Sequence, residues 1–363
     1  MKNKRTQIAV FGVKGFPAFG GASRASESVV NLLKDRYDYT IYSVASHTNR
    51  KGYYSGYYQI VFKKFPGKRL NTFLYYIQSV LHALFLGSYD IVQINHTSSG
   101  FIIPILRLKY KVVSTARGVI PKDDNKWNRI DKFMFNISAY LFFRFSNIVV
   151  TVSKPHIKIF SKLTSKKILY IPNGINTDDY THDACNKDDY LLFAASRIIF
   201  LKGLHVFLES LNMLKYESQV VIIGNLDHTL DYKKKLLKLS QNRNLIFTGL
   251  IKEKQKLFLY IKKAKLFIFP SFNEGMSNML LEVASFKTPI ICSDIRENAA
   301  VFSANEVLFF KVGDSIDLAR KIKWALSHPT VMNEKANRAY DKLNKFYNWT
   351  DISKKYAKIY ESF

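Results

Sequence analysis

Cysteine is nearly absent from this sequence. Of 363 residues only Cys185 and Cys292 are cysteines, and they form no CxxC pair. Two isolated cysteines build no disulfide framework. The sequence also has no zinc or iron–sulfur ligand spacing, no short-period repeat and no low-complexity run. This cysteine usage suits a reducing compartment such as the cytosol.

Long apolar runs are absent as well. No segment reaches the ~20 consecutive apolar residues that a transmembrane helix needs. The first residues are basic, but their apolar core is only Ile8–Phe11, which is too short for the apolar region of a secretory signal. We therefore expect this stretch to be the first buried strand of a cytoplasmic protein.

Acidic residues are scarce, and their scarcity is uneven. The chain holds 55 Lys and Arg against 28 Asp and Glu, a net charge of +27. Residues 1–170 alone hold 27 basic against 7 acidic residues. Such a basic half indicates an anionic partner: a membrane surface, a phospholipid-linked acceptor or nucleic acid. The alternative is a lysine-rich solvated surface that reflects genome composition.

Short apolar runs alternate with amphipathic segments in both halves. This alternation predicts an α/β fold with parallel sheets, and the length allows two domains. We expect Ser23 and Ser153 to cap helices and further helices at 70–86, 127–145, 252–264 and from Trp349 onward. The expected strands are 8–12, 39–44, 89–95, 112–115, 148–152, 168–171, 190–195, 220–224, 245–249, 266–269 and 290–292.

The stretch from Leu266 to Asn298 carries the strongest signal. An apolar run ends at Pro270, a polar loop follows, and Ser277 or Asn278 can cap a helix. Thr288-Pro289 ends that helix before a second apolar run. This is a βαβ unit, and open α/β sheets bind ligands at the carboxyl ends of their strands.

Two carboxylates flank the expected helix start: Glu274 in the loop and Glu282 in the second turn. The first amides of a helix have no intrahelical acceptor and lie at the positive end of the helix dipole, so they form an anion site. Such a site would bind a phosphate through the backbone and hydroxyl groups on both sides of it through the carboxylates. A nucleotide sugar has this arrangement of groups. The residues that supply these amides are Gly275, Met276, Ser277 and Asn278.

Glu274 and Glu282, set in a strand–loop–helix–Thr-Pro–strand frame, resemble the donor signature of the retaining glycosyltransferase family 4, which has the GT-B fold. The resemblance implies two Rossmann-like domains facing across a cleft, with a C-terminal helix that crosses back to the first domain. It places the acceptor-binding domain at 1–170, a linker at 171–187, the nucleotide-sugar domain at 188–345 and the returning helix at 346–363.

The resemblance also assigns donor contacts in the second half. Arg197 and Lys202, which precede Gly203, resemble the family's arginine and lysine that contact the diphosphate. They imply a metal-independent enzyme with no cofactor, whose co-substrate is a nucleoside diphosphate sugar, a UDP-sugar by preference. Glu282 is then expected to hold the ribose and Glu274 the sugar hydroxyls near the reacting carbon.

The first half resembles the family less completely. Gly20 and Gly21 match its Gly-Gly loop beside the donor phosphate, although small residues also suit a plain strand–helix turn. His96 follows a strand, where the family often has a histidine near the transferred sugar; a lone histidine is otherwise structural. Arg117 resembles a residue of the acceptor-facing loop, or is a surface arginine. Arg24 stands near the position where many members have glutamate, which favours an anionic acceptor.

These observations favour a retaining hexosyltransferase that acts on a lipid-linked saccharide in the synthesis of a capsule or another surface polysaccharide. We expect the enzyme to be peripheral on the inner face of the plasma membrane and to bind no nucleic acid. The apolar segment Leu70–Leu86, next to Lys63, Lys64 and four tyrosines, suits either the headgroup level of a bilayer or the protein core. Other classes stay open: a sugar-nucleotide epimerase, a phosphorylase or a basic nucleic-acid-binding protein.

Overall fold

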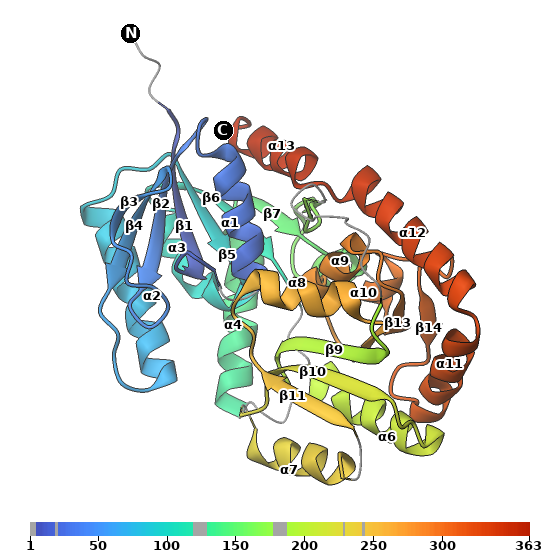
Figure 1. Ribbon diagram of the computed structural model, residues 1–363. Coiled ribbons are helices and arrows are strands. Elements are labelled where there is room, and N and C mark those ends of the chain that lie inside the picture. Colours follow the sequence, from blue (N-terminus) through green and yellow to red (C-terminus); the bar gives the residue numbers. More distant parts are fainter. Residues whose placement is uncertain (1–4, 19–20, 119–128, 177–186, 228, 242–243) are drawn as a thin grey trace. The chain divides into compact units, whose positions relative to one another are not determined.

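The computed structural model describes the chain except residues 1–4, 19–20, 119–128, 177–186, 228 and 242–243. It divides into two compact units (Figure 1). The first comprises Met1–Asn173 and Trp349–Phe363, and the second comprises Gly174–Asn348. No helix of the described residues is long and apolar enough to cross a membrane.

The first unit is built on an eight-stranded sheet of order β3-β4-β2-β1-β5-β6-β7-β8. Its strands are parallel except for β3, which pairs antiparallel with β4. The bounds are β1 Gln7–Lys14, β2 Asp38–Val44, β3 Gly52–Tyr54, β4 Tyr57–Phe62, β5 Ile91–Asn95, β6 Lys111–Ala116, β7 Ile148–Thr151 and β8 Ile168–Tyr170.

Alternation along β1 assigns the helices to the two faces of this sheet. Ile8 and Val10 point to a core shared with α1 (Gly21–Leu33) and α13 (Trp349–Tyr360), whereas Ala9 and Phe11 point to the opposite core. This is the two-residue period of a strand that is buried on both faces. The second face is covered by α2 Lys68–Phe85, η1 Thr97–Ile102, α3 Ile103–Leu106, α4 Arg129–Phe145 and α5 Lys154–Phe160.

The second unit holds a parallel six-stranded sheet of order β11-β10-β9-β12-β13-β14. Its central strands are β9 Tyr190–Arg197 and β12 Leu266–Phe269, flanked by β10 Gln219–Asn225, β11 Leu245–Gly249, β13 Ile290–Ser293 and β14 Leu308–Phe310. The helices are α6 Leu204–Leu214, α7 Leu230–Leu239, α8 Lys254–Lys263, α9 Asn278–Ser285, α10 Arg296–Ala299, α11 Ser315–Ser327 and α12 Pro329–Phe346, with the short η3 at Phe200–Lys202.

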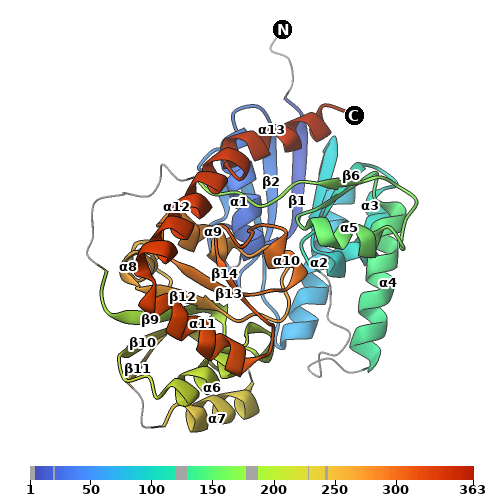
Figure 2. The ribbon, with the colours of Figure 1, turned by 90° about the vertical axis from the view of Figure 1, so that its right-hand side faces the viewer.

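The last helix belongs to the first unit, as expected. Helix α13 begins at Trp349, packs on α1 and places Tyr360 5.3 Å from the ring of Tyr37; Figure 2 shows the two helices together. Just before it, the Ile175 amide donates to Tyr347 O over 2.7 Å. The expected α/β architecture of two parallel-sheet domains is thus confirmed.

Of two expected caps, the one at Ser23 is wrong and the one at Ser153 is confirmed in position but not in bonding. Helix α1 begins at Gly21, so Ser23 lies within its first turn, where its hydroxyl donates to Val13 O over 3.0 Å and does not cap. Ser153 does stand at the N-cap of α5, but its side chain makes no capping bond. For Ser23 the hydroxyl suited a cap, but a contact with β1 uses it instead. Helix α2 begins at Lys68, two residues before the expected start, and α4 is described from Arg129.

Candidate functional site

The N-terminus of α9 stands at the carboxyl end of β12, as the sequence predicts. Ser277 is its N-cap, and the Ser277 hydroxyl accepts from the Leu280 amide over 3.4 Å. That bond satisfies one of the first-turn amides, which have no acceptor of their own within a helix. Glu282 is buried in the next turn, with 5% of its surface exposed. A helix N-terminus thus opens at the sheet edge with a buried carboxylate one turn behind it.

Lys202 and Glu274 meet at this edge. Their Nζ and Oε1 atoms lie 2.5 Å apart, and the side chains are 26% and 10% exposed. The lysine comes from η3, which follows β9, and the glutamate comes from the loop after β12. Because β9 and β12 are neighbouring parallel strands, their carboxyl ends share one edge. The structure therefore brings together two of the residues that the sequence assigns to a donor site.

A glycine makes this meeting possible. Gly203 has φ +69°, and a Cβ at that position would lie 2.0 Å from Pro270 O. The two loops are further joined by a 2.9 Å hydrogen bond from the Phe272 amide to Leu201 O. Only a residue without a side chain lets the lysine loop lie this close to the end of β12.

Three stacked rings tie the same loops to α6. The ring centroids of Phe200 and His205 lie 4.6 Å apart, and those of His205 and Phe272 lie 5.7 Å apart. The hydroxyl of Tyr232 accepts from the His205 amide over 3.2 Å and lies 2.9 Å from its Nδ1. Burial, with a contribution from Lys235, lowers the pKa of His205 to about 4. A neutral ring fits the geometry, because the single Tyr232 proton is then donated to Nδ1.

Arg197 ends β9 with an exposed side chain. Arg197 at the end of β9 and Lys202 just after it thus lie at the same end of the strand next to β12, and Arg197 is open to solvent. Among the described residues, no group of three or more His, Cys, Asp or Glu is arranged to hold a metal ion.

In the first unit, His96 follows β5 in a strained conformation. Its φ is +82°, a region that costs a non-glycine residue about 1–3 kcal/mol. The backbone is held there by the His96 amide, which donates to Thr115 O over 3.2 Å, and by the Ser99 amide, which donates to His96 O. Such strain is typical of functional positions, and His96 is half-buried at the carboxyl edge of the sheet.

Arg117 is held by a polar network that the sequence did not reveal. Its guanidinium donates to Asn95 Oδ1 (3.0 Å), Ser26 Oγ (2.9 Å) and Asn173 Oδ1 (3.3 Å). Burial lowers its pKa, while Tyr356 acts in the opposite direction. The network joins α1, β5, α13 and the end of the first unit, so Arg117 organises this edge. The one hint in the sequence was the polar Asn95 at the end of this strand.

Of the glycine loop, Gly20 lies outside the described residues. Gly21 is the exposed first residue of α1, and Arg24 lies half-buried one turn further. Phe16, in the chain after β1, is held by the fully buried Gln59, which the sequence analysis also missed. Its Oε1 accepts from the Phe16 amide over 2.8 Å and its Nε2 donates to Phe16 O over 3.1 Å.

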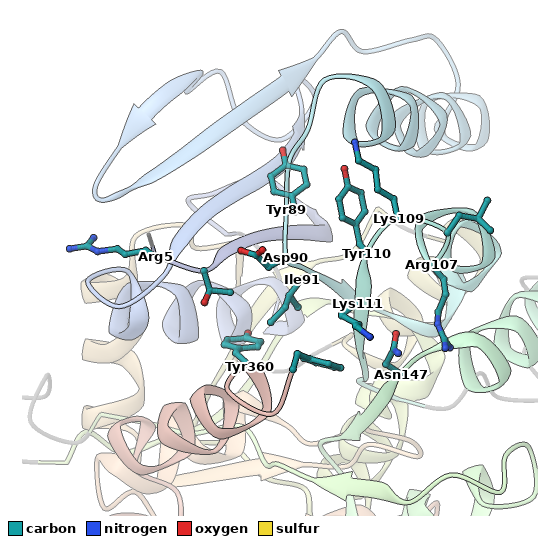
Figure 3. A pocket seen from close by; sticks show the side chains of 13 residues that line it. Arg5, Tyr89, Asp90, Ile91, Arg107, Lys109, Tyr110, Lys111, Asn147 and Tyr360 are labelled. Atoms are coloured by element: carbon teal, nitrogen blue, oxygen red, sulfur yellow. The ribbon is translucent and has the colours of Figure 1, made fainter. Parts of the chain in front are cut away.

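A basic pocket lies at the opposite edge of the first sheet, where β1, β5 and β6 begin (Figure 3). Its volume is about 780 Å³. Several of its charged groups already have protein partners: Lys109 donates to Leu84 O over 2.7 Å, Arg107 donates to Phe145 O over 2.7 Å, and Asp90 accepts from the Gln7 amide. This pocket is separate from the strand ends that carry His96 and Arg117.

Comparison with solved structures shows the fold. The chain superposes on sucrose-phosphate synthase from Thermosynechococcus elongatus with TM-score 0.82 and 16% identity, covering 99% of each chain. It superposes on Anabaena Alr3699/HepE in complex with UDP-glucose with TM-score 0.80 and 16% identity, covering 99% of this chain and 100% of that one. At such identities the likeness concerns architecture alone.

Curated relatives come from surface-polysaccharide systems. The Campylobacter jejuni N,N'-diacetylbacillosaminyl-diphospho-undecaprenol alpha-1,3-N-acetylgalactosaminyltransferase is 24% identical over 96% of this chain and 98% of its own length. The capsular polysaccharide biosynthesis glycosyltransferase CapM of Staphylococcus aureus is 23% identical over 47% of this chain, a match that spans 46% of that relative.

Two family models match consecutive parts of the sequence. The model described as Glycosyltransferase Family 4 matches residues 19–179, and the one described as Glycosyl transferases group 1 matches residues 181–345. Together they span both structural units. The chain therefore belongs to glycosyltransferase family 4 and has the GT-B fold.

Proposed function

We propose that this glycosyltransferase is a retaining hexosyltransferase that uses a nucleoside diphosphate sugar, a UDP-sugar by preference. Its acceptor is a hydroxyl of a lipid-linked saccharide in surface-polysaccharide synthesis. The donor class is supported by the structural likeness to a protein solved with UDP-glucose. The acceptor class is supported by the full-length relative named for a diphospho-undecaprenol substrate.

The observation that carries the donor assignment is the Lys202–Glu274 pair beside the N-terminus of α9. A nucleoside diphosphate needs its negative charge neutralised as it departs. Lys202, Arg197 and the first-turn amides of α9 supply positive charge and N–H donors for this purpose. These groups lie on fixed strand ends, so they need little reorganisation during the reaction.

The remaining donor contacts follow the family resemblance. Glu282 holds the ribose, while Glu274, oriented by Lys202, holds sugar hydroxyls near the reacting carbon. His96 orients the sugar from the first unit. In the reaction the bond between the sugar carbon and the donor phosphate breaks, and the acceptor oxygen bonds to that carbon on the same face. The acceptor proton passes to the departing phosphate.

Gly21 and Arg24 belong to the start of α1; the family resemblance assigns Gly20 and Gly21 to the donor phosphate and Arg24 to the acceptor. The Arg117 guanidinium is engaged by Asn95, Ser26 and Asn173. We therefore propose that Arg117 shapes the acceptor side mainly by fixing these side chains, and that an acceptor phosphate meets Arg24 first.

The test compares two lysines that flank the same pair of strands. Lys202→Ala removes the cation at the carboxyl edge. Lys265→Ala removes the partner of Asp189, an ion pair of 2.7 Å at the amino ends of β9 and β12. UDP release is measured with a panel of UDP-sugars and a polyprenyl-diphosphate saccharide. We expect kcat/KM to fall about 10²–10³-fold for Lys202→Ala and to change less than twofold for Lys265→Ala.

Glu274→Gln, which keeps the shape of the side chain, should behave like Lys202→Ala. Retention is read from the anomeric configuration of the product by NMR. Equal losses for Lys202→Ala and Lys265→Ala would contradict the donor site, and conversion of the sugar nucleotide without any acceptor would make the enzyme an epimerase.

A further inference from the structure

Helix α2 carries a row of apolar side chains that are largely exposed to solvent. Leu70, Phe73, Ile77, Leu81 and Phe85 are 51%, 52%, 37%, 49% and 78% exposed. Their spacing of three or four residues places them along one side of the helix. The opposite side is buried against the sheet through residues such as Tyr75 and Val80. The helix is therefore apolar on both its core face and its outer face.

Helix α4 has a second such face. Ile130, Phe133, Met134, Ile137 and Tyr140 are 71%, 64%, 54%, 37% and 54% exposed, again at helical spacing along one side. Exposed apolar residues scattered singly are ordinary, but contiguous apolar patches of this kind mark interaction sites.

The two faces adjoin. An ion pair of 2.6 Å joins Arg69 on α2 to Asp131 on α4. Between the helices lies η1, whose Phe101 stacks on Phe73 with centroids 6.4 Å apart. Figures 1 and 2 both show α2 and α4 on the same side of the first sheet, reaching beyond its edge. The stripes thus form one apolar surface of the first unit.

The charge around this apolar surface is positive. The two helices carry five Lys and Arg and a single acid, Asp131, whose charge is already paired with Arg69. Exposed Lys63 and Lys64 precede α2. Val61, Phe65 and the outer side of α2 line an apolar groove of about 640 Å³. Apolar residues between cations complement the acyl chains and phosphates of a lipid surface.

We propose that the outer faces of α2 and α4 insert into the headgroup and upper acyl region of an anionic lipid bilayer. The proposal rests on the proposed function in one respect, because a lipid-linked acceptor lies in such a bilayer. Insertion along two adjacent helices holds the first unit at the membrane surface without a spanning segment. The cations beside the apolar surface determine the preference for anionic lipid, and the apolar side chains determine how deeply the helices insert.

The test uses the full-length chain and sedimentation with vesicles of phosphatidylcholine alone or with 30% phosphatidylglycerol. The wild type should bind the anionic vesicles at least tenfold more strongly at low salt. Phe73→Ser combined with Ile77→Ser should lower binding about tenfold or more. The matched control, Leu230→Ser combined with Leu259→Ser, changes apolar residues that are 72% and 53% exposed on the second unit, and should bind like the wild type.

A second variant leaves both helices intact. Lys63→Gln combined with Lys64→Gln should weaken binding to anionic vesicles by about fivefold per lysine, the equivalent of ~1 kcal/mol each, without changing binding to neutral vesicles. Thermal unfolding of both variants reports whether the first unit, which carries these substitutions, is still folded. Unchanged vesicle binding in both variants would overturn the proposal.

Two further outcomes separate this proposal from the function proposed above. If vesicle binding depends on α2 but this protein uses no sugar nucleotide, the result would support the membrane surface and refute the transferase assignment. A wild type that ignores vesicles but dimerises in solution, with a dimer broken by Phe73→Ser and Ile77→Ser, would show that a second copy of the chain covers the surface and would refute membrane insertion.

Discussion

Replacing Gly203 by alanine adds one methyl group where the chain has no room for it. Gly203 separates Lys202 from α6, its φ is +69°, and the added Cβ would lie 2.0 Å from Pro270 O and 3.2 Å from Pro270 Cβ. Since Pro270 ends the buried strand β12, its backbone cannot yield easily. The loop that carries Lys202 must therefore move away from the loop that carries Glu274.

The free-energy cost of Gly203→Ala has two parts, and a second glycine of the same unit allows them to be measured separately. Gly249 has φ +72°, but a Cβ there meets nothing within 4 Å. Gly249→Ala should therefore cost only the left-handed conformation, about 1–2 kcal/mol. Gly203→Ala costs that amount plus the overpacking, which adds about 1–3 kcal/mol. For a unit of this size each kcal/mol corresponds to about 2–4 °C in Tm.

Thermal unfolding and UDP titration measure the two consequences. We expect Gly203→Ala to unfold at a lower temperature than Gly249→Ala and to bind UDP at least tenfold more weakly than the wild type, because Lys202 no longer faces Glu274. Gly249→Ala is the control for backbone strain alone. If both variants lose the same stability, the close approach to Pro270 is not what requires glycine at this position, and the reasoning fails.

The remaining predictions concern a buried histidine and a buried arginine. The pKa of His205 is about 4 in the folded protein against ~6.5 when unfolded, so the unfolded chain binds the extra proton. The free energy of unfolding therefore falls as the pH drops from 6.5 towards 4, by about 3 kcal/mol in total. Denaturant titrations across this range should show the loss and His205→Phe should remove it, whereas a loss of equal size in that variant would contradict the assignment. Arg117→Ala leaves Asn95, Ser26 and Asn173 with a missing donor and should lower the free energy of unfolding by about 2–4 kcal/mol. Asn173→Ala, which removes a single acceptor, should cost about 1 kcal/mol by the same measurement, and the reverse order would show that the network is not centred on the arginine.

The positions of individual strands and helices could be predicted from the sequence. The short apolar run before Pro270 predicted β12, and the cap expected at Ser277 or Asn278 predicted where α9 begins, because strand burial and helix capping depend on neighbouring residues. The return of the chain at Trp349 followed from the family resemblance and is confirmed in α13. Ser23 shows the limit of such reasoning, since a hydroxyl suited to capping was used for a contact with β1.

The sequence by itself thus determined the α/β alternation, the strand–loop–helix that opens at Glu274 and the family. Tertiary structure decided which residues meet: Lys202 and Glu274, 72 positions apart, lie together because β9 and β12 are neighbours in the sheet. It also joined Ser26 and Asn173 through Arg117, and left one side of α2 exposed although both sides are apolar. Periodicity within a segment reports which residues share a face, but only strand order and the packing of distant segments decide what that face touches.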